Sequence, residues 1–291
     1  MDTGAALDQR TDDWYQARIG KVTASRAGAV LGVSKFQTRE GLMREMVQEY
    51  YGEKLYASSP ALQWGNDHED TAIAKYESLT GNLVVSTGLH ASGEYPWLAA
   101  SPDGLVEGEA EPGLLEVKCP YSQQLATLEE NQGYYVQVQI QLFVTGRAWC
   151  DFFCWTPKGY HKERVLPDRD YMAEILPKLA AFQAEYVAVL ADEELSSRYR
   201  RPAERDDSEW RDAVERYSRE KAAAAVAADR EKAAREELIR LAGGENVRGA
   251  GCTLSHFVRV GSIDYRAAEA AGIDLSPYRR PSTIQTRVSM K

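Results

Sequence analysis

The sequence has little that would tie it to a membrane or to an oxidising compartment. Its four cysteines, among 291 residues, follow neither a disulfide-framework spacing nor that of a complete zinc site. No apolar run reaches the roughly 18 residues of a membrane-spanning helix, and no charged-then-apolar leader begins the chain. We therefore expect a cytoplasmic protein with reduced thiols and no membrane partner.

The sequence also lacks the basic excess of a general polyanion binder. Its formal net charge is −9, and residues 1–205 hold 30 acidic against 20 basic side chains. Residues 206–291 are near neutral, with 14 acidic and 15 basic. If the chain handles DNA, it must do so in a local basic channel where metal ions offset carboxylates.

A short apolar run at 114–119 lies between Gly113 and Pro120 and predicts a buried β-strand. Side chains alternate between the faces of a strand, so Glu116 and Lys118 should point the same way. Buried charges are normally paired or bound to a metal. The pair therefore indicates either a metal site or a solvated or structural ion pair.

A Pro-Asp-Gly turn centred on Asp103 follows an expected strand at 95–100. The loop at 107–113 is short enough to bring that strand back beside the one at 114–119. Asp103 should then lie next to Glu116 and Lys118. Two carboxylates and an ammonium at strand ends suit a divalent-metal phosphodiesterase, since acidic oxygens hold Mg²⁺ and the lysine orients a water.

Periodicity places the other elements of residues 1–205 in an α/β order with a mixed sheet. Helices are expected at 12–18, 24–31, 38–51, 62–80 and 170–195, and in the stretch that runs from Pro120 to about residue 145. Strands are expected at 83–91, 95–100, 114–119, 149–155 and 160–166. Gln137 and Gln141 fall on one face of the helix that ends near 145, and such a pair usually marks an exposed face.

The tail has a different composition. From 208 to about 241 it is rich in Ala, Glu, Arg and Lys, which predicts a long solvated helix ended by Gly243-Gly244. Strands are expected at 253–260 and 283–290, with a short helix at 265–270 between them. We therefore divide the chain into residues 1–205 and a stalk with a small C-terminal module, residues 206–291.

Three motifs in order resemble those of the lambda-type phage exonucleases, also called YqaJ-like viral recombinases, within the PD-(D/E)xK nuclease superfamily. They are 101–105 (SPDGL), 115–120 (LEVKCP) and 135–139 (YVQVQ), joined by W-x-x-x-R at 14–18, TAS at 23–25 and L-x-W-G at 62–65 with Glu69. The resemblance covers roughly residues 12–195. It implies a restriction-endonuclease-like core, a central mixed β-sheet flanked by helices, to which the tail adds the long helix and small β module.

The resemblance also implies residue roles at a site for two Mg²⁺ ions, with Mn²⁺ as a substitute. Its expected metal ligands are Glu69, Asp103, Glu116 and the carbonyl of Val117. Its expected catalytic residues are Asp103, Glu116, Lys118 and Gln137, with Lys118 positioning the attacking water. Its expected contacts to DNA are Arg18, Ser25 and Ser101 at a terminal 5′-phosphate, and Leu62 as an apolar wedge between the strands.

The activity that the resemblance implies is 5′→3′ digestion of one strand of linear double-stranded DNA from phosphorylated ends. The product would be a 3′ single strand passed to a single-strand annealing protein for phage-type recombination, inside a bacterial or phage-infected cell. A homotrimeric ring is expected, whose basic channel would be compatible with an acidic exterior. We expect the tail to dock the annealing partner.

Two other functions remain open. The first is a DNA endonuclease of the same superfamily, although a Cas4-like enzyme would need one early and three late cysteines, and none precedes Cys119 here. The second is a non-catalytic assembly protein that binds DNA ends, in which Asp103, Glu116 and Lys118 form a buried structural triad.

Overall fold

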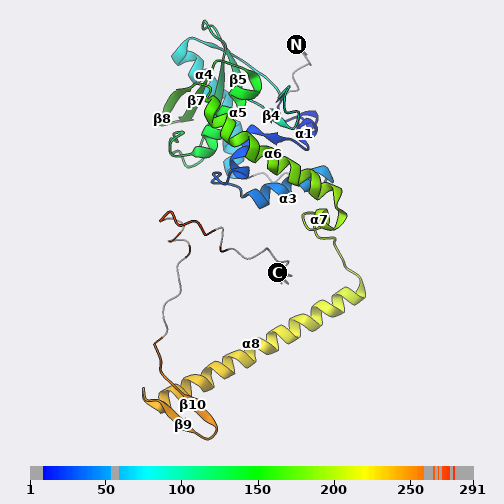
Figure 1. The fold of residues 1–291 in the computed structure, drawn as a ribbon, viewed down its shortest axis with the longest axis vertical. Coiled ribbons are helices and arrows are strands. Elements are labelled where there is room, and N and C mark those ends of the chain that lie inside the picture. The colour runs from blue at the N-terminus through cyan, green and yellow to red at the C-terminus, as the bar shows by residue number, and fades with distance from the viewer. Residues whose placement is uncertain are drawn as a thin grey trace. The chain divides into compact units, whose positions relative to one another are not determined.

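The computed structural model describes residues 9–53 and 59–258, together with residues 265, 268, 271–275 and 278. The chain forms two compact units, Met1–Pro202 and Ala203–Lys291. The first unit is a mixed α/β fold in which helices cover a twisted sheet (Figure 1). The expected fold class is therefore confirmed for this part of the chain.

The central sheet of the first unit has five strands in the order β2-β5-β6-β7-β8. Only the β6–β7 pair is parallel, so the sheet is mixed as expected. The strands are β2 (Leu83–Val85), β5 (Gly104–Glu107), β6 (Gly113–Lys118), β7 (Trp149–Thr156) and β8 (Gly159–Val165).

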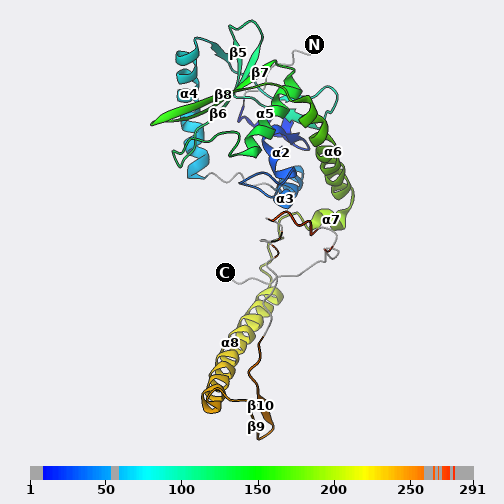
Figure 2. The same cartoon turned by 60° about the vertical axis from the view of Figure 1, so that its left-hand side comes forward.

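Two helices pack on opposite faces of this sheet (Figure 2), namely α4 (Pro60–Thr80) and α5 (Gln132–Thr145). Tyr76 of α4 packs in one core cluster with Val117, whereas Val138 of α5 packs in another with Leu114. Strand β6 therefore alternates between the two helices, as the sequence pattern predicts. Its face toward α5 carries Glu116.

A second sheet corrects the expected strand pairing. It has three strands in the order β1-β4-β3, which are β1 (Val22–Thr23), β4 (Leu98–Ala100) and β3 (His90–Ala91). The expected strand at 83–91 is thus two short strands in different sheets. The expected strand at 95–100 shortens to β4, and it pairs with β1 and β3 rather than with β6.

The antiparallel partner of β6 is β5, a strand that the sequence pattern does not predict. Pro102 has no N–H for a sheet ladder, so the chain leaves β4 there and starts a new strand at Gly104. A Cβ on Gly104 would lie 2.2 Å from a side-chain methyl of Val84, so only glycine lets β2 pair this closely with β5. The turn motif therefore begins a strand and places Asp103 at its start.

The described part of the first unit has five more helices, which are α1 (Asp12–Arg18), α2 (Ala24–Val30), α3 (Arg39–Tyr50), α6 (Arg169–Ala191) and α7 (Glu193–Ser197). Of these, α2, α3 and α6 share the largest core cluster with α5. Helix α2 approaches α5 closely, because a Cβ on Gly28 would lie 3.2 Å from the Cα of Gly133. The single helix expected at 170–195 is two, since Asp192 ends α6 and its carboxylate caps α7 by accepting from Glu194 N and Leu195 N.

The second unit contains α8 (Ser208–Ala242), a helix of 35 residues with no buried residue. Asp207 caps its start and Gly243, with φ +62°, ends it, as the composition predicts. The antiparallel strands β9 (Val247–Gly249) and β10 (Cys252–Leu254) follow, so the strand expected at 253–260 is shorter and starts earlier. The strand expected at 283–290, and most of the helix expected at 265–270, lie outside the described residues.

None of the helices within the described ranges is both long and apolar enough to cross a membrane.

Candidate active site

The backbone of β6 fixes Asp103 at the start of β5. The amide of Asp103 donates to the carbonyl of Leu115 (3.1 Å), and its Oδ2 accepts from the amide of Val117 (2.7 Å). These two bonds hold the carboxylate between the residues that flank Glu116. The expected juxtaposition of Asp103 with Glu116 is therefore found, although Asp103 leads into β5, a strand that the sequence pattern did not predict.

Glu116 has a side chain only 1% exposed, and hydrogen-bond donors surround it. Its Oε1 accepts from Gln137 Nε2 (2.6 Å) and forms an ion pair with the Lys118 ammonium, while its Oε2 accepts from Gln141 Nε2 (2.6 Å). The structure thus places Gln137 against Glu116, and its catalytic role stays a prediction. Three donors compensate a buried carboxylate that would otherwise cost several kcal/mol in desolvation.

The charges of the site perturb one another. Burial, and next the negative charge of Glu116, raise the pKa of Asp103 well above its ordinary value. Burial also raises the pKa of Glu69 on α4, although Arg10 opposes that shift through an ion pair. Burial alone would lower the pKa of Lys118, but the carboxylates of Glu116 and Asp103 outweigh it and the net shift is upward. The two carboxylates therefore favour the ammonium form of Lys118, which can orient a water by donating to it.

The donor set fits a divalent cation. Asp103, Glu116 and Glu69 are partly or fully buried acidic side chains that influence one another's charge, and hard oxygen ligands of this kind suit Mg²⁺ or Mn²⁺. Across residues 9–53 and 59–258, no three side chains of the acidic, histidine or cysteine type are already arranged around one metal position. Arg10 pairs with Glu69 and Lys118 pairs with Glu116, so each carboxylate would have to release its cationic partner to ligate a metal.

A second cluster gathers around Arg18 at the end of α1. Its Nη2 donates to the hydroxyls of Thr23 (3.2 Å) and Ser25 (3.5 Å), and its guanidinium lies 4.1 Å from the ring centroid of Trp14. Trp14 Nε1 in turn donates to Ser101 Oγ (3.1 Å). The three residues predicted at a phosphate pocket therefore belong to one cluster, with Trp14 as the link.

Burial, and next the positive charge of Arg26, lower the pKa of Arg18 to about 10. Desolvation and a neighbouring cation both favour an anion at this position. Ser101 belongs to this cluster, and Asp103 of the acidic site follows it by two residues. One short segment, 101–103, therefore joins the Arg18 cluster, which favours an anion, to the acidic site.

Leu62 belongs to neither the acidic site nor the Arg18 cluster. It lies near the start of α4 with 55% of its surface exposed, seven residues before Glu69. Seven residues make about two helical turns, or roughly 10 Å along the axis. The structure thus leaves an apolar side chain in solvent on the helix that carries Glu69, and its role as a wedge stays a prediction.

Four residues of these clusters were not assigned to them from the sequence: Arg10, Trp14, Thr23 and Gln141. The expectation for Gln141 was wrong, because it is fully buried against Glu116 rather than on an exposed helix face. Its spacing of four residues from Gln137 was the available signal, since such residues share a face. Trp14 and Thr23 belong to motifs that resemble the family, but the resemblance implied no role for them.

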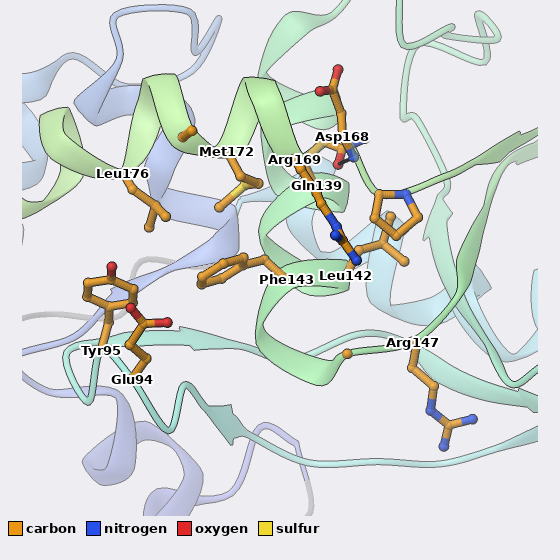
Figure 3. A pocket seen from close by; sticks show the side chains of 13 residues that line it. Glu94, Tyr95, Gln139, Leu142, Phe143, Arg147, Asp168, Arg169, Met172 and Leu176 are labelled. Carbon is orange, nitrogen blue, oxygen red and sulfur yellow. Dashed lines mark hydrogen bonds between the residues drawn. The ribbon is translucent and has the colours of Figure 1, made fainter.

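The cavity in Figure 3, of about 500 Å³, lies elsewhere. Residues of α5, α6 and the turn before β4 line it, and Gln139 is among them, whereas Asp103 and Glu116 are not. Gln139 Nε2 donates to the carbonyl of Leu166 (3.0 Å), and Gln139 Oε1 accepts from the amide of Asp168 (2.8 Å). The second glutamine of the 135–139 motif therefore fixes the connection from β8 to α6.

Known proteins resemble this chain in both sequence and fold. The crystal structure of an alkaline exonuclease, LHK-Exo, from Laribacter hongkongensis is 34% identical with a TM-score of 0.52, and covers 61% of this chain and 93% of its own. A second structure of LHK-Exo, in complex with dAMP, is 35% identical with a TM-score of 0.53 at the same coverage. The model of the YqaJ-like viral recombinase domain matches residues 13–148.

The chain belongs to the YqaJ-like viral recombinase family. The resemblance drawn from the motifs is thereby confirmed, and the matched range contains every site residue expected from the sequence. Protein R354 of Acanthamoeba polyphaga mimivirus, which is uncharacterized, is 26% identical over 161 residues. That match takes in 50% of this chain but only 29% of the viral protein, so the chain spans less than a third of that relative.

Proposed function

We propose that this protein is a metal-dependent exonuclease that digests one strand of linear double-stranded DNA from its 5′ end. The observation that carries the proposal is the meeting of Asp103, Glu116 and Lys118 where β5 and β6 pair. Its similarity to LHK-Exo, an alkaline exonuclease, supports the reaction class. The product would be a 3′ single-stranded overhang, the substrate of recombination by strand annealing.

Glu69, Asp103, Glu116 and the carbonyl of Val117 would hold two Mg²⁺ ions, with Mn²⁺ as a substitute. When bound, such ions polarise the phosphodiester and favour the deprotonated form of an attacking water. Gln137 and Gln141 would keep the Glu116 carboxylate oriented toward the site, since each binds one of its oxygens. Lys118 would donate to the attacking water and offset negative charge on the reacting phosphate.

The Arg18 cluster would recognise the end of the strand. Arg18 would pair with a terminal 5′-phosphate, and the hydroxyls of Ser25 and Ser101 would donate to its oxygens. A terminal phosphate carries more negative charge than an internal one, so this pocket would favour phosphorylated ends. Leu62, exposed at the start of α4, would separate the strands ahead of cleavage.

The assembly and its partners are also part of the proposal. The resemblance implies a homotrimer around the product strand, and a ring would let an acidic protein present a basic channel to DNA. Residues 206–291 would dock a single-strand annealing protein through the surface of α8, which has no buried residue. The work would take place in the cytoplasm of a bacterial or phage-infected bacterial cell.

Substitution of Lys118 by alanine tests the reaction class. We expect Lys118→Ala to lose nearly all Mg²⁺-dependent cleavage of linear duplex while it still binds DNA. Lys178→Ala is the matched control, since Lys178 forms an exposed ion pair with Glu174 on α6, and it should cleave like the wild type. If Lys118→Ala and the wild type cleave at the same rate, the triad is structural and the protein is not this nuclease.

A further inference from the structure

Arg10 lies just outside the range matched by the family model, yet it contacts the acidic site. Its guanidinium forms an ion pair with Glu69, and the side chains of the pair are 42% and 23% exposed. The backbone of Arg10 has φ +69°, a left-handed conformation that residues with a Cβ rarely adopt. Glycine would adopt this backbone conformation with less strain. The side chain of Arg10, rather than its backbone, is therefore the feature of this position that needs a functional explanation.

Neighbouring residues hold this backbone without help from the Arg10 side chain. Gln9 Nε2 donates to the carbonyls of Pro102 (2.8 Å) and Thr87 (3.1 Å). After Arg10, Thr11 caps α1, and Trp14 donates to Ser101. Contacts on both sides of Arg10 therefore attach residues 9–14 to the segment that leads into Asp103. Residues 9–14 thus connect the acidic site with the Arg18 cluster.

The guanidinium of Arg10 lies where a counterion of Glu69 would lie. Burial disfavours the charge of Glu69, and Arg10 is the largest influence that stabilises it. Arg10 pairs with Oε2 of Glu69, and a divalent cation held by Glu69 would bind the same carboxylate, so the cation and Arg10 would compete for it. Arg10 can move away, because its side chain is partly in solvent and its backbone is fixed by others.

We propose that Arg10 is a displaceable counterion that pairs with Glu69 in the metal-free protein, is released by the metal, and then contacts a backbone phosphate of the bound strand. The inference rests on the proposed function. A released guanidinium binds phosphate well, because its fork of N–H donors matches two phosphate oxygens. A strand whose 5′-phosphate lies at Arg18 and whose reacting phosphodiester lies at Asp103 would run beside residues 9–14.

The first arm of the test measures Mn²⁺ binding to the full chain by calorimetry, without DNA. Arg10→Gly removes the competitor and suits the backbone, so it should bind Mn²⁺ about two- to fivefold more tightly, the range that a partly exposed ion pair provides. Arg10→Lys keeps the charge and should stay near the wild-type affinity. Arg39→Ala, which removes a comparably exposed pair with Glu185, is the control and should change nothing.

The second arm measures binding of a 5′-phosphorylated duplex with Mn²⁺, in a Lys118→Ala background that prevents digestion. Adding Arg10→Gly should weaken this binding about three- to tenfold. Unchanged or weaker Mn²⁺ binding by Arg10→Gly would overturn the counterion role, and unchanged duplex binding would overturn the phosphate contact. Absence of Mn²⁺ binding by the wild type itself would instead refute the proposed nuclease.

Discussion

Gln141 gives the sharpest prediction, because the sequence did not assign it to the site. Its Nε2 donates to Glu116 Oε2 at 2.6 Å in a fully buried position. A hydrogen bond to a charged group contributes roughly 1.5–3 kcal/mol. In Gln141→Met the side chain keeps its approximate volume, but one oxygen of Glu116 loses its donor and the carboxylate can rotate away from the site.

The loss should appear mainly in function rather than in stability. Gln141 Oε1 is buried without a hydrogen-bond partner among the described residues, so methionine also removes an unfavourable group. We therefore expect the free energy of unfolding to fall by only about 1–2 kcal/mol. Mn²⁺ affinity and kcat/KM should fall about 10- to 100-fold, since groups that orient metal ligands usually have effects of this size.

Gln139 supplies the matched control on the same helix. It is almost fully buried too, but its hydrogen bonds go to Leu166 and Asp168 rather than to Glu116. Gln139→Met should lose stability, by urea unfolding, without losing metal affinity once folded. The reasoning would be refuted by a folded Gln141→Met protein that binds Mn²⁺ and cleaves duplex as the wild type does.

Three further predictions address the pocket, the charge balance and the tail. Arg18→Gln should lower the preference for 5′-phosphate over 5′-hydroxyl ends about tenfold in a competition digest, with little change for hydroxyl ends; an unchanged preference would contradict the pocket. Because the pKa of Asp103 is raised in the folded protein, its protonated carboxyl stabilises the fold fully below the ordinary pKa of about 4. That contribution is lost as pH rises through the raised pKa. Metal-free Asp103→Asn should therefore be more stable than the wild type in urea at pH 8, with a difference that shrinks toward pH 4; a constant difference would oppose this. Deletion of residues 206–291 should abolish capture of a single-strand annealing protein but leave digestion intact, and retained capture would exclude docking on the tail.

Local rules predicted the features that depend on neighbours in sequence. The alternation along β6 places Glu116 and Lys118 on one face, and the Pro-Asp-Gly turn places Asp103 beside them, although through β5 rather than through the expected strand. The composition of 208–241 likewise predicts α8, because an Ala-rich helix with opposed charges needs no tertiary contact. These elements match the structure within a few residues.

Tertiary contacts decided what local rules could not. Strand β5 is only four residues long and begins inside the turn motif, so its pattern was indistinguishable from a loop. Gln141 is buried because the facing strand buries a carboxylate 25 residues away in sequence. Arg10 and Glu69 are 59 residues apart, and no periodicity links an arginine before α1 to a carboxylate on α4.

The central claim is that the Arg18 cluster and the acidic site act together on the end of a strand. Its most direct test is digestion, with and without Mg²⁺, of one linear duplex carrying either 5′-phosphate or 5′-hydroxyl ends, beside a covalently closed circle of the same sequence. We predict Mg²⁺-dependent loss of nucleotides from the 5′ end, faster from phosphorylated ends, with the circle untouched. Cleavage of the closed circle, or equal rates on both kinds of end, would contradict the account.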